Sequence, residues 1–128
     1  MTASSFASLL LAVVALAVFP AHAAEDYDNC TDFIDSVPAT ISTQGVWCLR
    51  DNLATSLTSG TAVTIAANNV TVDCNDFKIG GLGAGPESQM VGLATLDPRQ
   101  NTTVRNCSVR GFRYGIILDG AGHLVEDN

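Results

Sequence analysis

Short runs of β-branched residues alternate with Asn, Asp and Gly along most of this chain. Three phrases share one pattern, a Val- and Thr-rich run set against Asn and Asp, and they occupy residues 68–81, 101–112 and 123–128. In the two complete copies, a second short strand and glycines follow the run. Aligning Val72, Val104 and Val125 gives steps of 32 and 21 residues. A strand–turn–strand unit that recurs every roughly 20–30 residues predicts a β-solenoid.

The other apolar runs are equally short. In residues 38–53, Gly45 separates two predicted strands, and the apolar side chains of this stretch are Ile41, Val46, Trp47, Leu49 and Leu53. Residues 62–65 and 70–72 then flank a polar Asn68-Asn69 corner. Such short strands between Asn or Gly turns do not suit a β-sandwich. They suit the coils of a β-helix, because Asn tolerates the left-handed backbone of tight corners.

A Gly-rich stretch lies between the first two copies of the phrase and accounts for the longer step. Residues 80–88 predict a loop inserted at one corner of the solenoid. The stretch lacks both a following helix and the lysine of a Walker motif, so it does not predict a phosphate-binding loop.

Both ends of the repeat region carry predictions of their own. Residues 25–35 are acidic and predict a short helix, with Thr31 or Asp32 as its N-cap. We interpret residues 24–40 as an N-terminal cap, because a bare first coil would expose apolar surface and open strand edges. The last phrase stops at Asn128 without a polar cap. We therefore expect this chain to be the N-terminal portion of a longer β-helix, with a continuation of the same β-helix as its neighbour.

The N-terminal segment predicts export. Residues 9–19 form an unbroken apolar run, and an Ala-x-Ala site follows it with cleavage expected after Ala23. The run is too short to span a bilayer and is typical of a secretory signal peptide. We therefore predict a signal peptide over residues 1–23, a secreted or periplasmic location, and no membrane insertion after cleavage.

The amino-acid composition limits the classes of molecule that this chain is expected to bind. The 128-residue chain has a formal net charge of −7, and every charged residue lies after the predicted signal peptide. This charge disfavours nucleic acid and anionic membranes, whose phosphates would be repelled. It does not choose between neutral and cationic ligands, and solubility alone is a sufficient explanation for it.

Four cysteines remain after cleavage, and an even number in a small exported domain favours disulfides. Of the three possible connectivities we favour Cys30–Cys48 and Cys74–Cys107, because each pair joins neighbouring segments of a solenoid. The second pair falls in different columns of the registers that we tried. A zinc site is the alternative, but no pair has C-x-x-C spacing and His123 stands alone. We expect no metal site.

Two blocks carry a family resemblance: I-S-T-Q-G-V-W-C-L-R-D-N-L at residues 41–53 and I-A-A-N-N-V-T-V-D-C-N-D-F-K-I-G-G at residues 65–81. They resemble the opening coils of bacterial right-handed parallel β-helix repeat proteins, a group that includes NosD-like periplasmic proteins and relatives of pectate lyases. The resemblance covers residues 41–128 and implies an all-β, right-handed parallel β-helix. Two departures are Asp76, where such phrases often carry Gly, and Cys107 at the corresponding turn of the next coil.

The resemblance also implies a class of chemistry. Enzymes of this fold cleave or epimerise acidic polysaccharides, or hydrolyse glycosidic bonds; lyases use carboxylates to hold calcium and often an Arg as base. Asp97 and Asp119 follow matching strands, G-L-A-T-L-D and G-I-I-L-D, which would place them in neighbouring coils about 4.8 Å apart. They are our candidate catalytic pair. The alternative is that both residues cap turns.

Two further groups are candidates for binding. Asp73, Arg105 and Glu126 share a column, which is either a site or a surface salt-bridge ladder. Arg110, Arg113 and Tyr114 surround Phe112 and offer aromatic faces and guanidinium groups to sugar rings and carboxylates, so we name them as candidate ligand-binding residues. The alternative places Phe112 in the core and both arginines on the solvent side.

Two functions remain open. The first is an exported β-helix module that binds carbohydrate or presents a structural surface, without chemistry of its own. The second is the front of a polysaccharide lyase or glycoside hydrolase. We expect a polysaccharide partner and no cofactor, with calcium only if the chemistry is that of a lyase.

Overall fold

The computed structural model describes residues 27–128, and this part is all-β apart from one 3₁₀ turn, η1 Leu82–Ala84. The predicted signal peptide lies outside the described residues. The strands are β1 Asp32–Phe33, β2 Ala39–Ile41, β3 Gly45–Cys48, β4 Leu53–Ala54, β5 Thr61–Ile65, β6 Val70–Asp73, β7 Lys78–Gly80, β8 Val91–Thr95, β9 Arg99–Gln100, β10 Thr103–Arg105, β11 Ser108–Arg110, β12 Tyr114–Ile117, β13 Gly120–Ala121 and β14 Leu124–Glu126.

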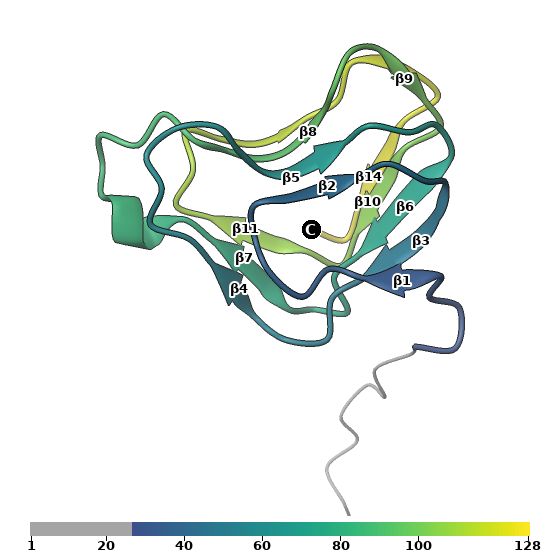
Figure 1. The fold of residues 1–128 in the computed structure, drawn as a ribbon, viewed down its shortest axis with the longest axis horizontal. Helices are drawn as coiled ribbons and strands as arrows, with labels where there is room; N and C mark the ends of the chain where they lie inside the picture. Colours follow the sequence, from purple (N-terminus) through teal and green to yellow (C-terminus); the bar gives the residue numbers. More distant parts are fainter. Residues whose placement is uncertain (1–26) are drawn as a thin grey trace, which may run out of the picture.

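All strand pairs are parallel and belong to four sheets, with the orders β1-β3-β6-β10-β14, β4-β7-β11, β2-β5-β8-β12 and β9-β13. From β3 onward the chain visits the five-, three- and four-stranded sheets in a constant order, and we call one such passage a coil. In Figure 1 these three sheets form three sides of the molecule, and β9 projects at one corner. Two adjacent parallel strands cannot be joined by a tight turn and need a longer crossover connection. Here the crossover between two strands of one sheet is the part of the chain that runs through the other sheets.

The register confirms the spacing predicted from the sequence. Val104 pairs with Val72 on one side and with Val125 on the other, so the steps are 32 and 21 residues. The longer coil contains the Gly-rich stretch, which connects β7 to β8 through η1. The inserted loop therefore lies at the corner between the three- and four-stranded sheets (Figure 1).

The core is built from columns of apolar side chains that stack from coil to coil. Val72 and Val104 in the five-stranded sheet, Ile79 in the three-stranded sheet and Leu93 in the four-stranded sheet are fully buried. Each such side chain contributes about 1.5–3 kcal/mol when removed from water. Thr103, next to Val104, is only partly buried, as the alternation of strand side chains requires.

Asparagines form the corners, as predicted. Asn69 and Asn101 occupy equivalent corners with φ of 56° and 57°, and the Asn101 side-chain amide donates to Asn69 Oδ1 at 3.0 Å. At the opposite corner, Asn75 donates to the Leu49 carbonyl at 3.1 Å and Asn128 to the Val104 carbonyl at 2.9 Å. Asn75 and Asn128 thus satisfy carbonyl groups of the preceding coil, and Asn69 and Asn101 are joined side chain to side chain.

The helix predicted within residues 25–35 is wrong for the part that the structure describes. Asp32–Phe33 is strand β1, and the flanking amides of Thr31 and Ile34 donate to the carbonyls of Val46 and Cys48 at 2.7 and 2.9 Å. A helix this short is marginal by itself, so pairing with β3 prevails. Ile34 is 3% exposed and joins the core.

Both predicted disulfides, Cys30–Cys48 and Cys74–Cys107, are present, with Cα–Cα distances of 5.8 and 4.8 Å. Between two paired positions, the earlier coil has residues 74–77 and the later coil only residues 106–107. This bulge explains why no single register aligned the cysteines of the second pair. Disulfides of this kind form in oxidising compartments outside the cytosol.

The bulge also accommodates Asp76, at a position where Gly was expected. Asp76 has φ of 66°, in the left-handed region where Gly is free of strain, and its amide donates to the Asn106 carbonyl at 2.9 Å. Asp is among the few other residues that tolerate this conformation.

Thr102→Val is expected to raise the free energy of unfolding by about 1 kcal/mol. The Thr102 hydroxyl is fully buried and has no hydrogen-bond partner among the described residues, so its removal abolishes a desolvation cost. Denaturant unfolding measures the change. Thr103→Val, at a partly exposed neighbouring position, is the matched control and should change stability by less. A loss of stability in Thr102→Val would contradict the assignment.

Candidate functional site

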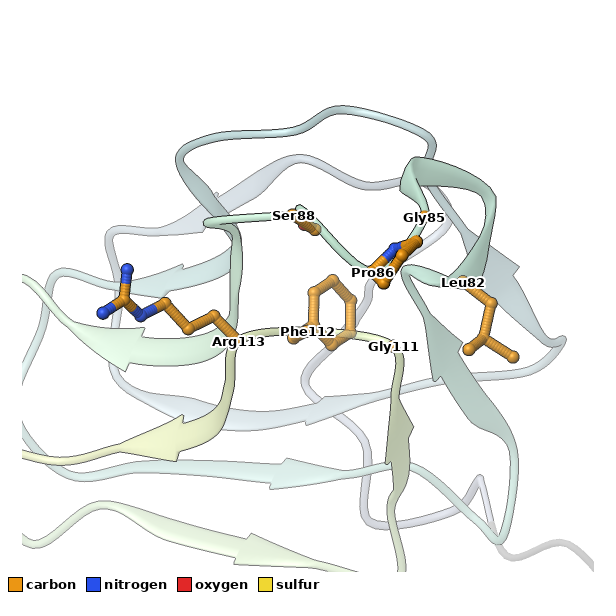
Figure 2. A pocket seen from close by; sticks show the side chains of 7 residues that line it. All are labelled: Leu82, Gly85, Pro86, Ser88, Gly111, Phe112 and Arg113. Carbon is orange, nitrogen blue, oxygen red and sulfur yellow. The ribbon is translucent and has the colours of Figure 1, made fainter.

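The inserted loop and the last complete coil line a partly open cavity of about 380 Å³. It lies where residues 82–88 pass over the segment that joins β11 to β12 (Figure 2). Its lining residues are Leu82, Gly85, Pro86, Ser88, Gly111, Phe112 and Arg113. A volume near 400 Å³ is within the range of small-molecule sites.

Glycines allow the two walls of this cavity to meet. Gly111 has φ of 81°, and a Cβ there would lie 2.3 Å from the Leu82 backbone nitrogen. The neighbouring Gly81 amide donates to the Arg110 carbonyl at 2.8 Å. Because backbone meets backbone at this point, only Gly fits at position 111 without moving the loop.

Phe112 is both a core residue and a cavity residue. Its ring packs against the buried apolar cluster, which agrees with the alternative that placed Phe112 in the core. A Cβ at Gly81 would lie 2.6 Å from Phe112 Cε1, and one at Gly92 would lie 3.0 Å from Cδ2. The ring thus occupies a slot between two glycines, and Figure 2 shows it pointing toward Pro86.

Arg113 and Tyr114 are brought together beside the cavity. The Arg113 guanidinium donates from Nη1 to Gln89 Oε1, and its central carbon lies 5.4 Å from the centroid of the Tyr114 ring. Figure 2 shows the Arg113 side chain extending away from Phe112. Arg110 ends β11 on the exposed surface and is not among the lining residues.

A second cavity of about 340 Å³ lies on the other side of the 3₁₀ turn. Leu82, 69% exposed, lines both cavities. The other lining residues are Ala54, Thr55, Ser56, Lys78, Gly80 and Gly83. Gln89, Leu82 and Lys78, which line or adjoin the two cavities, were not predicted as site residues. The only signal for them was the Gly-rich insertion, which we interpreted as a loop alone.

The candidate catalytic pair lies at corresponding corners of adjacent coils. The Asp119 amide donates to Thr95 Oγ1 at 2.8 Å, and its carbonyl accepts from the Arg99 amide at 2.9 Å. Asp97 has φ of 59°, and both Asp97 and Asp119 are exposed. Within residues 27–128, no hydrogen bond or ion pair involves either carboxylate. The catalytic assignment remains a prediction.

The column Asp73, Arg105 and Glu126 is confirmed by the strand register. Asp73 is 8% exposed, and its carboxylate accepts from Arg105 Nε at 2.8 Å, from Asn106 Nδ2 at 3.1 Å and from the Asn75 amide at 3.0 Å. Burial alone would raise the pKa of Asp73, but these donors together outweigh burial and lower that pKa below its usual value. A carboxylate satisfied in this way stabilises the corner and is not free to bind a ligand.

In the described part of the chain, no three His, Cys, Asp or Glu side chains are grouped so that they could hold a metal ion. None of the helical structure described there is long and apolar enough to cross a membrane. The chain matches no protein-family model, no curated protein and no solved structure.

Gly111→Ala is expected to lower the free energy of unfolding by about 2 kcal/mol or more, because a Cβ at this left-handed position meets the Leu82 backbone. Gly60→Ala is the matched control: Gly60 also has a positive φ, 96°, but a Cβ there has nothing within 4 Å. Thermal or denaturant unfolding measures both variants. Equal losses would show that backbone conformation, and not the contact with the loop, sets the cost.

Asp73→Asn is expected to lower the free energy of unfolding at pH 7 by about 2 kcal/mol, because Arg105 loses its charged partner. Since folding lowers the pKa of Asp73, its ionised form stabilises the protein above the unfolded pKa of about 3.9. That stability is lost as the pH falls through the lower folded pKa. The gap between wild type and variant should therefore shrink below about pH 4 in denaturant titrations.

Asp97→Asn is the control for this pH experiment, because Asp97 is exposed and Asn tolerates its left-handed backbone. It should change stability little at any pH. A gap between wild type and Asp73→Asn that stays constant from pH 7 to pH 3 would contradict the assigned role.

Proposed function

We propose that this protein is an exported right-handed parallel β-helix module that binds carbohydrate without chemistry of its own. The constant order in which the chain visits its parallel sheets supports the β-helix. Right-handed crossovers are the rule between parallel strands, which supports the handedness. The two disulfides and the predicted signal peptide over residues 1–23 support a secreted or periplasmic location.

The observation that carries the binding proposal is the Arg113–Tyr114–Gln89 group beside the cavity lined by Phe112. The Tyr114 ring is 51% exposed and offers an apolar face on which a sugar ring can stack. The guanidinium and the Gln89 amide supply planar, directional donors and acceptors for hydroxyl or carboxylate groups. Convergent polar groups beside an apolar cavity are the usual composition of a small-molecule site.

Two features favour binding over catalysis. Neither cavity is lined by a carboxylate, so neither contains the acid pair that glycoside hydrolysis needs or the carboxylates that would hold the calcium of a lyase. Asp97 and Asp119 lie outside both linings. One observation favours the alternative function, a polysaccharide lyase or glycoside hydrolase. The corners that carry Asp97 and Asp119 are stacked on each other, because the Asp119 amide donates to Thr95 Oγ1.

The test is titration of a panel of uronate-containing and neutral oligosaccharides by calorimetry. For the glycan that binds best, Arg113→Ala and Tyr114→Ala should each weaken binding by about 10-fold or more, equivalent to about 1.4 kcal/mol. Tyr114→Phe keeps the aromatic face and should retain most of the affinity. Binding that survives both alanine substitutions, or no binding by any glycan of the panel, would contradict the proposal.

The Arg110→Ala variant tests whether binding depends on the cavity alone or on the wider arginine cluster predicted from the sequence. Arg110 is exposed on the neighbouring strand but does not line the cavity, so this variant should bind almost as wild type.

The same polysaccharides are assayed for newly formed reducing ends or unsaturated products, which would indicate catalysis. Product release that is lost in Asp97→Asn or Asp119→Asn would establish the enzymatic alternative.

A further inference from the structure

The second cavity lies away from the last strands of the sheets. Its lining residues come from the end of β4 and the segment that follows it in the first coil, and from β7 and η1 in the second coil. Strand β7 is paired on both edges, with β4 on one side and β11 on the other. Figure 1 shows η1 beside the segment that follows β4, and a Cβ at Gly83 would lie 3.3 Å from Ser56 Cβ. This cavity is therefore formed by contacts between two coils and not by an unpaired strand.

Lys78 is the only lysine of the chain, and its side chain lies along one wall of this cavity. Lys78 and Gly80 share the outward face of β7, while Ile79 between them is fully buried. A Cβ at Gly80 would lie 3.5 Å from Lys78 Cε and 3.8 Å from Lys78 Cδ. The lysine stem therefore passes over Gly80, which carries the ammonium along β7 toward the inserted loop.

The ammonium of Lys78 has no partner of opposite charge. No ion pair joins it to a carboxylate within residues 27–128, and the cavity lining contains no Asp or Glu. A cation without a partner in a concave site attracts an anion. Because the chain has a net charge of −7 and the cavity has one cation, an anion with one negative charge fits better than an anion with two.

Two hydroxyl groups line the same cavity. Thr55 Oγ1 accepts a hydrogen bond from the Leu57 amide at 3.2 Å, so its own proton is free for another acceptor. The Ser56 hydroxyl makes no hydrogen bond within residues 27–128 and is exposed. These hydroxyls and the Lys78 ammonium give the cavity three donor groups from its two walls. Hydrogen bonds of this kind to a charged oxygen are stronger than those between neutral groups.

The rest of the lining is apolar and aliphatic. Ala54 and Leu82 supply methyl groups, and Gly80 and Gly83 supply backbone without side chains. No aromatic ring lines this cavity, whereas Phe112 lines the first one. An aliphatic lining offers no flat ring on which a sugar can stack, but it can remove an alkyl or aryl group from water. The second cavity therefore suits a different class of ligand from the first.

We propose that the second cavity binds small organic anions that join a single oxyanion group, such as a carboxylate, to a short apolar body. The Lys78 ammonium pairs with the oxyanion, and the Thr55 and Ser56 hydroxyls donate to its oxygens. The apolar body lies against Ala54 and Leu82. A volume of about 340 Å³ is at the small end of ligand pockets, so the body is a short alkyl chain or a single ring. This site does not depend on carbohydrate binding at the first cavity.

The experiment uses the full chain, exported into a bacterial periplasm so that its disulfides form and labelled with ¹⁵N. Hexanoate is titrated to about 10 mM while the amide chemical shifts are recorded, and we expect saturable shifts in residues 54–56 and 78–83 with a Kd below about 1 mM. Hexanamide keeps the apolar body without the charge and should bind at least about 10-fold more weakly. Acetate lacks four methylenes and should also bind at least about 10-fold more weakly, since each buried methylene contributes about 4-fold.

Lys78→Gln removes the charge and keeps most of the stem. It should weaken hexanoate binding by about 10-fold or more and leave hexanamide binding unchanged, a difference that a merely structural role would not produce. Arg110→Gln is the matched control. Arg110 pairs with Gly80 in the register of the next strand but does not line the cavity, so its loss should weaken hexanoate binding by less than about 3-fold.

The comparison of the three ligands needs no variant and stands even if Lys78→Gln fails to fold. Hexanamide or acetate binding as tightly as hexanoate would overturn the proposal, as would equal losses in Lys78→Gln and Arg110→Gln. Shifts centred on residues 111–113, or no saturable shift over the whole titration, would overturn it too.

Discussion

The register between successive coils is the constraint on which the rest of the structure depends. Side chains alternate between the two faces of a strand, so a slip of one residue would turn Val104 out of the core and bring Arg105 into it. In the observed register, Val104 is fully buried and Arg105 forms a 2.8 Å ion pair with Asp73 of the preceding coil. Apolar burial and the polar ladder therefore specify the same alignment.

The corner beside this ladder prevents the slip in two further ways. The Cys74–Cys107 disulfide joins the two coils covalently where the earlier coil bulges. The Asp73 carboxylate, nearly buried, is stable in its charged form only because three donors from the two coils meet it. A displaced register would leave this buried charge without partners. An unpaired buried charge strongly destabilises the folded state, so the misaligned structure is disfavoured.

The candidate site uses a corner where the chain is not constrained in this way. Between the three- and four-stranded sheets, an inserted loop is tolerated because strands on either side keep their register. Gly111 lets the following coil touch the loop backbone, and Phe112 fills a glycine slot beneath it. Arg113 and Tyr114 are thereby presented by a packed coil, so the loop supplies one wall of the cavity and the core fixes the other.

Local signals in the sequence determined the all-β class, the coil spacing through Val72, Val104 and Val125, and the asparagine corners. They favoured the observed cysteine pairing but did not place Cys74 beside Cys107, which needed the bulge. The class, the spacing and the corners follow from strand periodicity and corner conformation, which depend on neighbours along the chain. Only the tertiary structure decided that Thr31 and Ile34 flank a strand, because their amides bind a strand distant in sequence. The same holds for the cavity and for the donors around Asp73, since these contacts join residues of different coils that no local pattern relates.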